Sequence, residues 1–415
     1  MIDYIHSSKN QFDYKNQIFK TPHLILYMNF LIRFSFLFFI LAFFGCQNEP
    51  SKWNEDSSED NYELPPEEED FEEAKFKWGY INKAGQVVIR DRFDDARNFK
   101  EGLAVVRKKG KWGYINKQGT EVIPAQFKAA WSFSEGVARV LTFDKKMGFI
   151  DSNGKFTIEP NFDLVEDFHE GMARFFELGA FGFINKKGEK IITPTYDQAS
   201  NFKNGLAKIK YLGKYGMINK QGNITVPLQF EHLSYFKNGI AKARKNGKYG
   251  FINLKGKWMI EPTFDNARDF ENDLAPVCKN GKYGLINLQN EFIIDLEYDE
   301  IWFAGNNLWA TVKNQKYNYI KKDGTTVIAK DYDMLYSFSE KRAGYNEGYL
   351  WGFLDEKGQA ITPAHFGLVW DFKEGLARAA YRDGIGFINP NGELVLESIW
   401  KDARDFSEGL ARVQL

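Results

Sequence analysis

The sequence predicts an all-β protein built from ten tandem copies of a short antiparallel unit. A large apolar residue, followed by glycine in all copies but one, recurs through residues 78–415 at steps of 34 residues, with one step of 35. A fixed period of this length is typical of repeat architectures. The chain also holds 38 Phe, 20 Tyr and 10 Trp, with 36 Gly and only 12 Pro. This composition favours short strands joined by glycine turns over helices.

An export signal is expected before the repeats, at residues 28–45. An apolar run there follows Arg33 and ends just before Cys46, and a positive residue, a short apolar core and a small residue before the cut describe a secretory signal. Residues 1–27 are polar to mixed, so we interpret them as an upstream mis-start and expect Met28 to be the true start. One alternative is a cleaved signal without lipidation. The other is a transmembrane anchor, which Arg33 in mid-segment disfavours.

Cys46 resembles the lipid-modified cysteine of the bacterial lipobox. That resemblance implies an outer-membrane lipoprotein of the bacterial cell envelope, attached to the membrane through a lipid anchor. Phe43 and Phe44 depart from the Leu and the small residue that the pattern places there. Residues 46–77 are acidic and poor in aliphatic residues, which predicts a disordered tether. Its acidic cluster also resembles the surface-export signals of some bacterial lipoproteins, which would expose the repeats on the cell surface.

Charge and cysteine content exclude several classes of protein. Residues 1–77 carry 7 Lys and Arg against 14 Asp and Glu, whereas residues 78–415 carry 48 against 42. A surplus of positive charge this dilute does not indicate a nucleic-acid partner. Only two cysteines occur in the chain, so no disulfide framework holds the repeats together.

The first strand of the repeat is the WG motif itself. Residues 111–116 read KWGYIN, so Trp112 and Tyr114 are expected to point one way and the residues between them the other. Gly119 follows in a turn, and glycine recurs at this place in nine copies, which indicates a positive-φ position. A second strand is then expected to end at Pro124, because proline cannot donate to a ladder.

The segment after the second strand predicts a single helical turn. In the first copy Phe93, Ala96 and Phe99 lie three residues apart, Asp94 precedes the turn as a cap, and Gly102 follows as a stop. The alternating LAVV that comes next is expected to form a hairpin with the following WG strand, across the repeat boundary. A single unit cannot bury both of its faces, so the copies must stack.

The anchor dipeptides are expected to be structural. We expect the anchor glycines to serve the backbone and the anchor aromatics to form a continuous core stripe. The residues assigned to this role are Trp78, Gly79, Trp112, Gly113, Trp351 and Gly352.

The combined pattern KWGYINKxG…FDxAxxFxEGLAxV resembles the bacterial WG (KWG) repeat family across all ten copies. The resemblance implies a binding scaffold of the kind found in bacterial envelope and effector proteins. It implies no common catalytic residue and no cofactor.

The array could be open or closed. It begins with a WG strand that has no LAxV partner before it and ends with an LAxV strand that has no WG strand after it. These two halves could pair and close a propeller-like ring, which would remove both edges. Because propellers typically have four to eight blades, we predict an open, curved solenoid, with the closed ring as the alternative.

Copies seven and eight depart from the repeat pattern. The FxEGLA block fails there, and Trp302, Trp309 and Arg342 fall in or beside it. Sequence drift without a change in function is one interpretation. The other is that these positions no longer serve the scaffold and instead form a contact surface, and the three residues are then the candidate binding residues.

No catalytic constellation, metal site or cofactor site is predicted. His169, His232 and His365 occupy different phases of the repeat in distant copies, and no nucleophile, zinc or phosphate-binding motif occurs. Single acids, one per repeat, suit capping better than calcium binding. The sequence therefore predicts a non-enzymatic scaffold for an extracytoplasmic protein or glycan. The alternative is a structural spacer in an envelope assembly.

Overall fold

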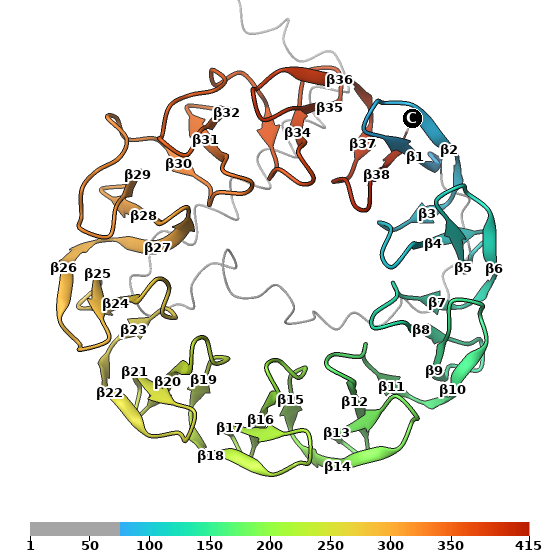
Figure 1. The fold of residues 1–415 in the computed structure, drawn as a ribbon, viewed down its shortest axis with the longest axis horizontal. Helices are drawn as coiled ribbons and strands as arrows, with labels where there is room; N and C mark the ends of the chain where they lie inside the picture. Colours follow the sequence, from blue (N-terminus) through green and yellow to red (C-terminus); the bar gives the residue numbers. More distant parts are fainter. Residues whose placement is uncertain (1–74, 415) are drawn as a thin grey trace, which may run out of the picture. The chain divides into compact units, whose positions relative to one another are not determined.

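The computed structural model describes residues 75–414, which contain strands and turns but no helix. The strands form ten small antiparallel sheets, which stand as blades around a common centre (Figure 1). In the four-stranded blades the shortest strand lies toward the centre and the longest on the outer side (Figure 1). The predicted all-β class and the tandem hairpin repeats are confirmed.

Eight blades have four strands and two have three. From the innermost strand outward, the first five are β37 (Asp402–Ala403), β38 (Leu410–Gln414), β1 (Trp78–Asn82), β2 (Val87–Phe93); β3 (Asp95–Ala96), β4 (Leu103–Lys108), β5 (Lys111–Asn116), β6 (Glu121–Phe127); β7 (Ala129–Ala130), β8 (Ala138–Leu141), β9 (Met147–Ile150), β10 (Phe156–Phe162); β11 (Leu164–Val165), β12 (Met172–Glu177), β13 (Ala180–Asn185), β14 (Lys190–Tyr196); β15 (Gln198–Ala199), β16 (Leu206–Tyr211), β17 (Lys214–Asn219), β18 (Ile224–Phe230). The other five are β19 (His232–Leu233), β20 (Ile240–Lys245), β21 (Lys248–Asn253), β22 (Trp258–Phe264); β23 (Asn266–Ala267), β24 (Leu274–Lys279), β25 (Lys282–Asn287), β26 (Phe292–Tyr298); β27 (Glu300–Gly305), β28 (Leu308–Lys313), β29 (Lys316–Ile320); β30 (Met334–Leu335), β31 (Ala343–Glu347), β32 (Leu350–Leu354); β33 (Leu368–Val369), β34 (Ala377–Ala380), β35 (Ile385–Ile388), β36 (Leu394–Trp400).

Each blade joins the second half of one copy to the first half of the next. The predicted hairpin across the repeat boundary is confirmed, because β4 pairs with β5 from Leu103↔Asn116 to Lys108↔Lys111. The two-residue turn between them has positive φ at both Lys109 (51°) and Gly110 (76°). A turn of this primed type matches the right-handed twist of the strands it joins.

The array closes on itself, so the predicted open solenoid is wrong and the alternative ring is correct. The first WG strand, β1, pairs with the last strand, β38, from Trp78↔Gln414 to Asn82↔Leu410. The two orphan half-blades are complementary in register and in hydrogen-bonding groups. Their pairing satisfies the edges that an open array would leave exposed.

The predicted helical turn after the second strand is also wrong. Asp95 and Ala96 instead form the short innermost strand β3, which pairs with β4 through Asp95↔Arg107. The chain then reverses through a two-residue turn at Glu101 and Gly102, where φ is 53° and 81°. The spacing of three identified the buried side chains correctly, but a pattern only one turn long does not distinguish a helix from a kinked extended segment.

Proline does not end the second strand as predicted. Strand β6 runs through Pro124 to Phe127, with a register shift opposite Trp112 and Tyr114. Because β6 is the outermost strand of its blade, no further strand lies beyond it, and proline is tolerated at such an edge although it has no N–H to donate. The positive φ predicted for Gly119 is confirmed at 79°, and the side chain of Asn116 accepts the N–H groups of two residues in that turn.

The hydrophobic core lies between neighbouring blades. Among its largest members are the residues two places after the anchor, such as Tyr80 and Tyr114, which are fully buried. The Tyr80 ring packs edge-to-face on Phe99 with centroids 5.0 Å apart, and Tyr114 packs on Phe133 in the same way at 5.2 Å. Each contact spans two blades, so the blades form one continuous ring of apolar packing.

Candidate binding surfaces

The six anchor residues occupy scaffold positions. A Cβ on Gly79 or Gly113 would lie 2.6 Å from a carbonyl oxygen of the next strand, and one on Gly352 would lie 2.6 Å from the Tyr345 ring. None of these glycines has positive φ, so close approach explains them. Trp78 is buried, whereas Trp112 and Trp351 are half-buried. The fully buried stripe is formed by the residues two places further along instead.

The turns nearest the ring's centre are built alike in all ten copies. We call these two-residue turns the inner turns, and both residues of each have positive φ. They are 101–102, 135–136, 170–171, 204–205, 238–239, 272–273, 306–307, 340–341, 374–375 and 408–409. Asparagine and glycine suit this conformation best, yet six inner turns begin with glutamate. A contact elsewhere must therefore offset the local strain of glutamate.

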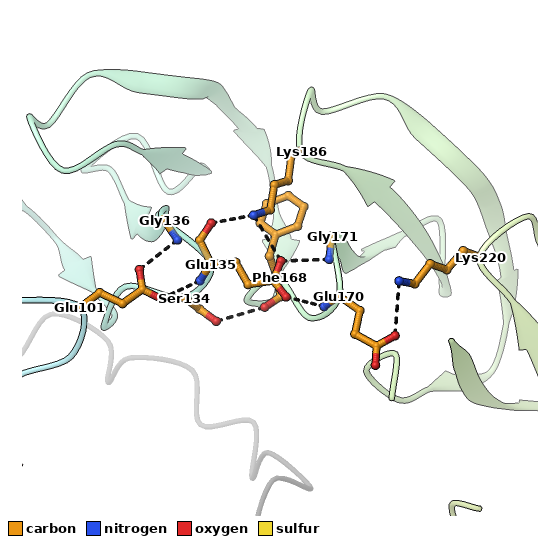
Figure 2. Close-up of polar contacts among 9 residues, drawn as sticks. All are labelled: Glu101, Ser134, Glu135, Gly136, Phe168, Glu170, Gly171, Lys186 and Lys220. Atoms are coloured by element: carbon orange, nitrogen blue, oxygen red, sulfur yellow. Dashed lines mark hydrogen bonds and ion pairs between the residues drawn. The ribbon is translucent and has the colours of Figure 1, made fainter. Parts of the chain in front are cut away.

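That contact is visible in Figure 2. The Glu101 carboxylate accepts hydrogen bonds from the backbone N–H groups of Glu135 (2.8 Å) and Gly136 (2.9 Å). Glu135 in turn accepts the N–H groups of Glu170 and Gly171. Glu101 and Glu135 thus each bind both amides of the inner turn in the next copy, a charge-assisted contact that is stronger than a neutral one.

The same contact continues around the closing blade. Glu374 accepts the N–H of Gly409 at 3.0 Å, and Glu408 accepts the N–H of Gly102 at 3.1 Å. The last copy is therefore linked to the first by the same glutamate-to-turn contact as interior copies.

A lysine from the copy beyond completes most of these contacts. Lys186 lies 3.3 Å from the Glu135 carboxylate, and Lys220 lies 3.3 Å from that of Glu170 (Figure 2). Partial burial raises the pKa of Glu135, but hydrogen bonds from Gly171, Lys186 and Glu170 outweigh it and hold the pKa below its usual value. The pKa of Glu170 is lowered for the same reason. Both carboxylates are therefore ionised in neutral solution.

Four consecutive copies lack the glutamate. Their inner turns begin with Asn204, Asn238, Asn272 and Asn306, and we call this stretch the asparagine arc. The lysine that would face Asn204 or Asn238 is also replaced, by Leu254 and Leu288 respectively. In these two copies both partners of the charged contact have therefore been lost, whereas the copy with Asn272 keeps a lysine, Lys322, at this position.

The boundary hairpins, which join strands such as β4 and β5, lie at the opposite end of these strands. Acids that the sequence suggested as caps act here. Asp299 pairs with Lys282 and accepts the backbone N–H of Asn314 at 2.8 Å, and Asp163 pairs with Lys146 at 2.5 Å. The capping role is real, but the amides belong to a hairpin turn rather than to a helix.

Three consecutive boundary hairpins carry large apolar side chains at their tips. Phe143 is 52% exposed, Leu178 is 97% exposed and Leu212 is 77% exposed, and we call these residues the apolar tips. The two leucines also have positive φ, 52° and 49°. The corresponding residue is asparagine in other copies, as at Asn246 and Asn280. Sequence inspection missed the apolar tips, although a leucine before glycine at a place that elsewhere holds asparagine was visible.

Trp309 cannot contact a partner in this structure, because it is 1% exposed. In all nine other copies the phenylalanine of the FxEGLA block keeps its place, whereas copy seven has Ala304 there. Where Trp309 stands, all nine other copies have alanine. A large and a small side chain have exchanged places, which preserves core volume.

Trp302 and Arg342 are half-buried. The Trp302 indole N–H donates to the Ser337 hydroxyl at 3.2 Å, and the Arg342 guanidinium donates to the Pro390 carbonyl at 2.8 Å. Both residues link neighbouring blades and keep part of their surface accessible. Cys46, the expected lipidation site, lies outside the described residues, as do residues 1–74 of the expected signal and tether.

Titratable side chains do not converge on a metal-binding cluster within residues 75–414. His169, His232 and His365 lie in separate blades. The described part of the chain also contains no helix that is long and apolar enough to cross a membrane.

Comparison with known proteins identifies the repeat. The model of the WG containing repeat matches residues 78–112, 112–145, 147–177, 181–215, 215–249, 249–283, 283–317, 319–351, 351–382 and 385–415. No curated protein matches the chain.

Solved structures similar to the ring share little sequence with it. A computationally designed protein, Ika8, is 12% identical over 64% of this chain and 96% of its own, with a TM-score of 0.35. A eukaryotic initiation factor is 10% identical over 77% and 95%, with a TM-score of 0.41. BamB from Moraxella catarrhalis is 8% identical over 77% and 95%, with a TM-score of 0.30. Values this low carry no inference about function.

Proposed function

The chain belongs to the family of proteins built from the WG containing repeat, and we propose that its ring is an exported, non-catalytic scaffold that binds an extracytoplasmic protein or glycan. In this proposal Cys46 carries the lipid that attaches the protein to the outer membrane of a bacterial cell envelope. The acidic tether then holds the ring clear of the membrane, exposed on the cell surface.

The observation that carries the binding role is the conformation of Leu178 and Leu212 at the apolar tips. A non-glycine residue in the left-handed region costs roughly 1–2 kcal/mol, and asparagine is one of the residues that tolerates it. Both leucines also leave their side chains in water, where they bury no apolar surface. They therefore lower the stability of the isolated ring, as expected of residues that contact a partner.

A structural spacer, the alternative, would not need such residues. Closure of the ring also hydrogen-bonds the terminal strands β1 and β38 to each other, so edge-to-edge stacking of copies through these strands is blocked. These two features favour a binding scaffold over a spacer.

The test compares capture by the wild-type protein with capture by the double variant Leu178→Asn, Leu212→Asn. Immobilised full-length protein is exposed to a detergent extract of the envelope and to a glycan array, and bound species are quantified. We expect the double variant to unfold at higher temperature, because asparagine fits the turn, and to lose most of its captured ligand.

The matched control is Lys109→Asn. It also places asparagine at a positive-φ position of a boundary hairpin (φ 51°), but it removes no apolar side chain. It should stabilise the ring and leave capture unchanged. If the double variant captures the same ligands as the wild type, the apolar tips are not the binding surface. Trp302→Ala and Arg342→Ala then test the other proposed contact residues in the same assay.

The proposed membrane attachment has a separate test. Mass spectrometry of the protein purified from membranes should show a mature chain that begins at an acylated Cys46. An unmodified Cys46 within a longer chain would rule out the lipid anchor without affecting the binding proposal.

A further inference from the structure

We propose that the asparagine arc binds carboxylate side chains of an acidic segment of a partner polypeptide. This inference rests on the proposed binding role of the ring and adds a second surface, at the opposite end of the strands from the apolar tips. It names the chemistry of the segment that this surface accepts.

The regular copies show what an inner turn binds. Where the preceding copy provides a glutamate, backbone N–H groups of the turn hold its carboxylate, and in the turns 135–136, 170–171 and 204–205 both residues donate. Glu170, for example, accepts the N–H groups of Asn204 at 2.6 Å and Gly205 at 2.8 Å. The same pair of donors therefore forms a carboxylate-binding site within this chain, and positive φ at both residues orients the two donors toward one acceptor group.

Asparagine does not fill that site. Its side chain is one methylene shorter than that of glutamate and has one acceptor oxygen instead of two. Asn272 reaches the next inner turn, but its amide nitrogen donates to the side-chain oxygen of Asn307 at 2.7 Å. Within the described residues no acceptor is placed on the N–H groups of Asn238 and Gly239, or of Asn306 and Asn307. These exposed turns retain the donors without the carboxylate.

Charge decides which inner turns of the arc can accept an external acid. The turn 272–273 includes Asp273 where most inner turns have glycine, and Glu356 holds the lysine position beside the turn 340–341, so each of these two turns has a carboxylate beside it that repels a second. The turns 238–239 and 306–307 carry none. These two turns, two copies apart, are the proposed binding sites.

The residues around the two sites favour a peptide over a small free acid. Lys322 holds, beside the turn 306–307, the repeat position from which Lys186 binds Glu135 in the regular copies. Beside the turn 238–239 that position is taken by Leu254, which is 52% exposed. One site thus offers two amides and a cation, and the other offers two amides and an apolar side chain. A polypeptide with two acidic residues and a nearby apolar residue can use both sites at once.

The experiment measures binding of a fluorescein-labelled 12-residue peptide, in which glutamate alternates with leucine or glycine, to the full-length protein by fluorescence polarisation. A peptide with glutamine in place of every glutamate is the reference. We expect the glutamate peptide to bind at least about ten-fold more tightly, the factor expected when charge-assisted hydrogen bonds are lost. Binding should weaken with salt.

Filling the sites from within should abolish this preference. The double variant Asn204→Glu, Asn272→Glu supplies the missing carboxylates, and we expect its affinity for the glutamate peptide to fall about ten-fold. The control Asn204→Gln, Asn272→Gln adds the same methylene groups without charge and should bind like the wild type. Circular dichroism checks that each variant is folded.

A second variant, which opens a site instead of filling one, keeps the test decisive if the double variant Asn204→Glu, Asn272→Glu folds poorly. Glu135→Gln removes the carboxylate from the turn 170–171 and leaves Lys186 in place, so it should create a further site and raise peptide binding. Equal binding of the glutamate and glutamine peptides by the wild type would overturn the proposal, as would unchanged binding in both Asn204→Glu, Asn272→Glu and Glu135→Gln. The Leu178→Asn, Leu212→Asn protein should bind the peptide normally, so failure of this inference and failure of the proposed function are distinguishable.

Discussion

Replacing Gly182 with valine should destabilise the ring by about 1–3 kcal/mol, the usual range for overpacking a tight site. A Cβ at this anchor position would lie 2.5 Å from the carbonyl oxygen of Ile192, 2.8 Å from the nitrogen of Pro194 and 2.9 Å from the Phe175 ring. Two of these three atoms are backbone atoms of the adjacent strand β14. Relief therefore requires β13 and β14 to separate, and a rotamer change in a neighbour cannot provide it.

The assay is urea unfolding followed by tryptophan fluorescence, with Gly182→Ala and Gly205→Ala as a matched pair. Gly205 has a positive φ of 77°, but a Cβ added there would meet no other atom within 4 Å, so alanine should cost only the roughly 1–2 kcal/mol of the left-handed conformation. Gly182 has no positive φ, so its alanine variant measures the steric cost alone. An unfolding midpoint unchanged by both Gly182 variants would show that these strands do not approach as closely as described.

Three further predictions concern other contacts. Arg139→Ala should cost about 3 kcal/mol in urea unfolding, because it removes a buried guanidinium that donates to the buried Glu166 carboxylate at 2.9 Å; a variant as stable as the wild type would contradict this. The pKa of Glu135 is lower in the folded than in the unfolded chain, so its stabilisation is complete above the unfolded value of about 4.3 and is lost as the pH falls through the folded value. Glu135→Gln should therefore flatten the dependence of the urea midpoint on pH below about 5. An unchanged slope would contradict the lowered pKa of Glu135 in the folded chain. The double exchange Ala304→Phe, Trp309→Ala should unfold at a higher temperature than either single variant, since it restores the volume pattern of the other copies; additive losses would mean that the two positions are not coupled.

The repeat unit and its boundary hairpin could be predicted because each depends on a local pattern that recurs. Turn glycines such as Gly119 were identified by recurrence alone, and their positive φ followed from stereochemistry. The segment around Ala96 was misassigned because three apolar residues at a spacing of three fit a helix or a kinked extended chain equally well. Only pairing with β4 selects the strand, and pairing is a property of the whole blade.

Closure and the binding surfaces depend on contacts between copies. The orphan half-blades predicted that closure was possible, but the wedge angle between blades, which decides it, is set by packing between them. The exchange of Ala304 and Trp309 was visible on comparing the copies, and that comparison would have placed Trp309 in the core. The asparagine arc required the structure, because the link from Glu101 to the turn of the next copy crosses a blade boundary.

Construction of each blade from two half-copies has a consequence for how the protein can change in length. The first and last half-blades complement each other whatever number of whole copies lies between them. Gain or loss of one unit of 34 residues would leave the pairing of β1 with β38 chemically unchanged. Only the circumference, and with it the angle that the side chains between blades must accommodate, would differ. Recombination between copies can therefore produce rings of other diameters in single genetic steps, each already equipped to close.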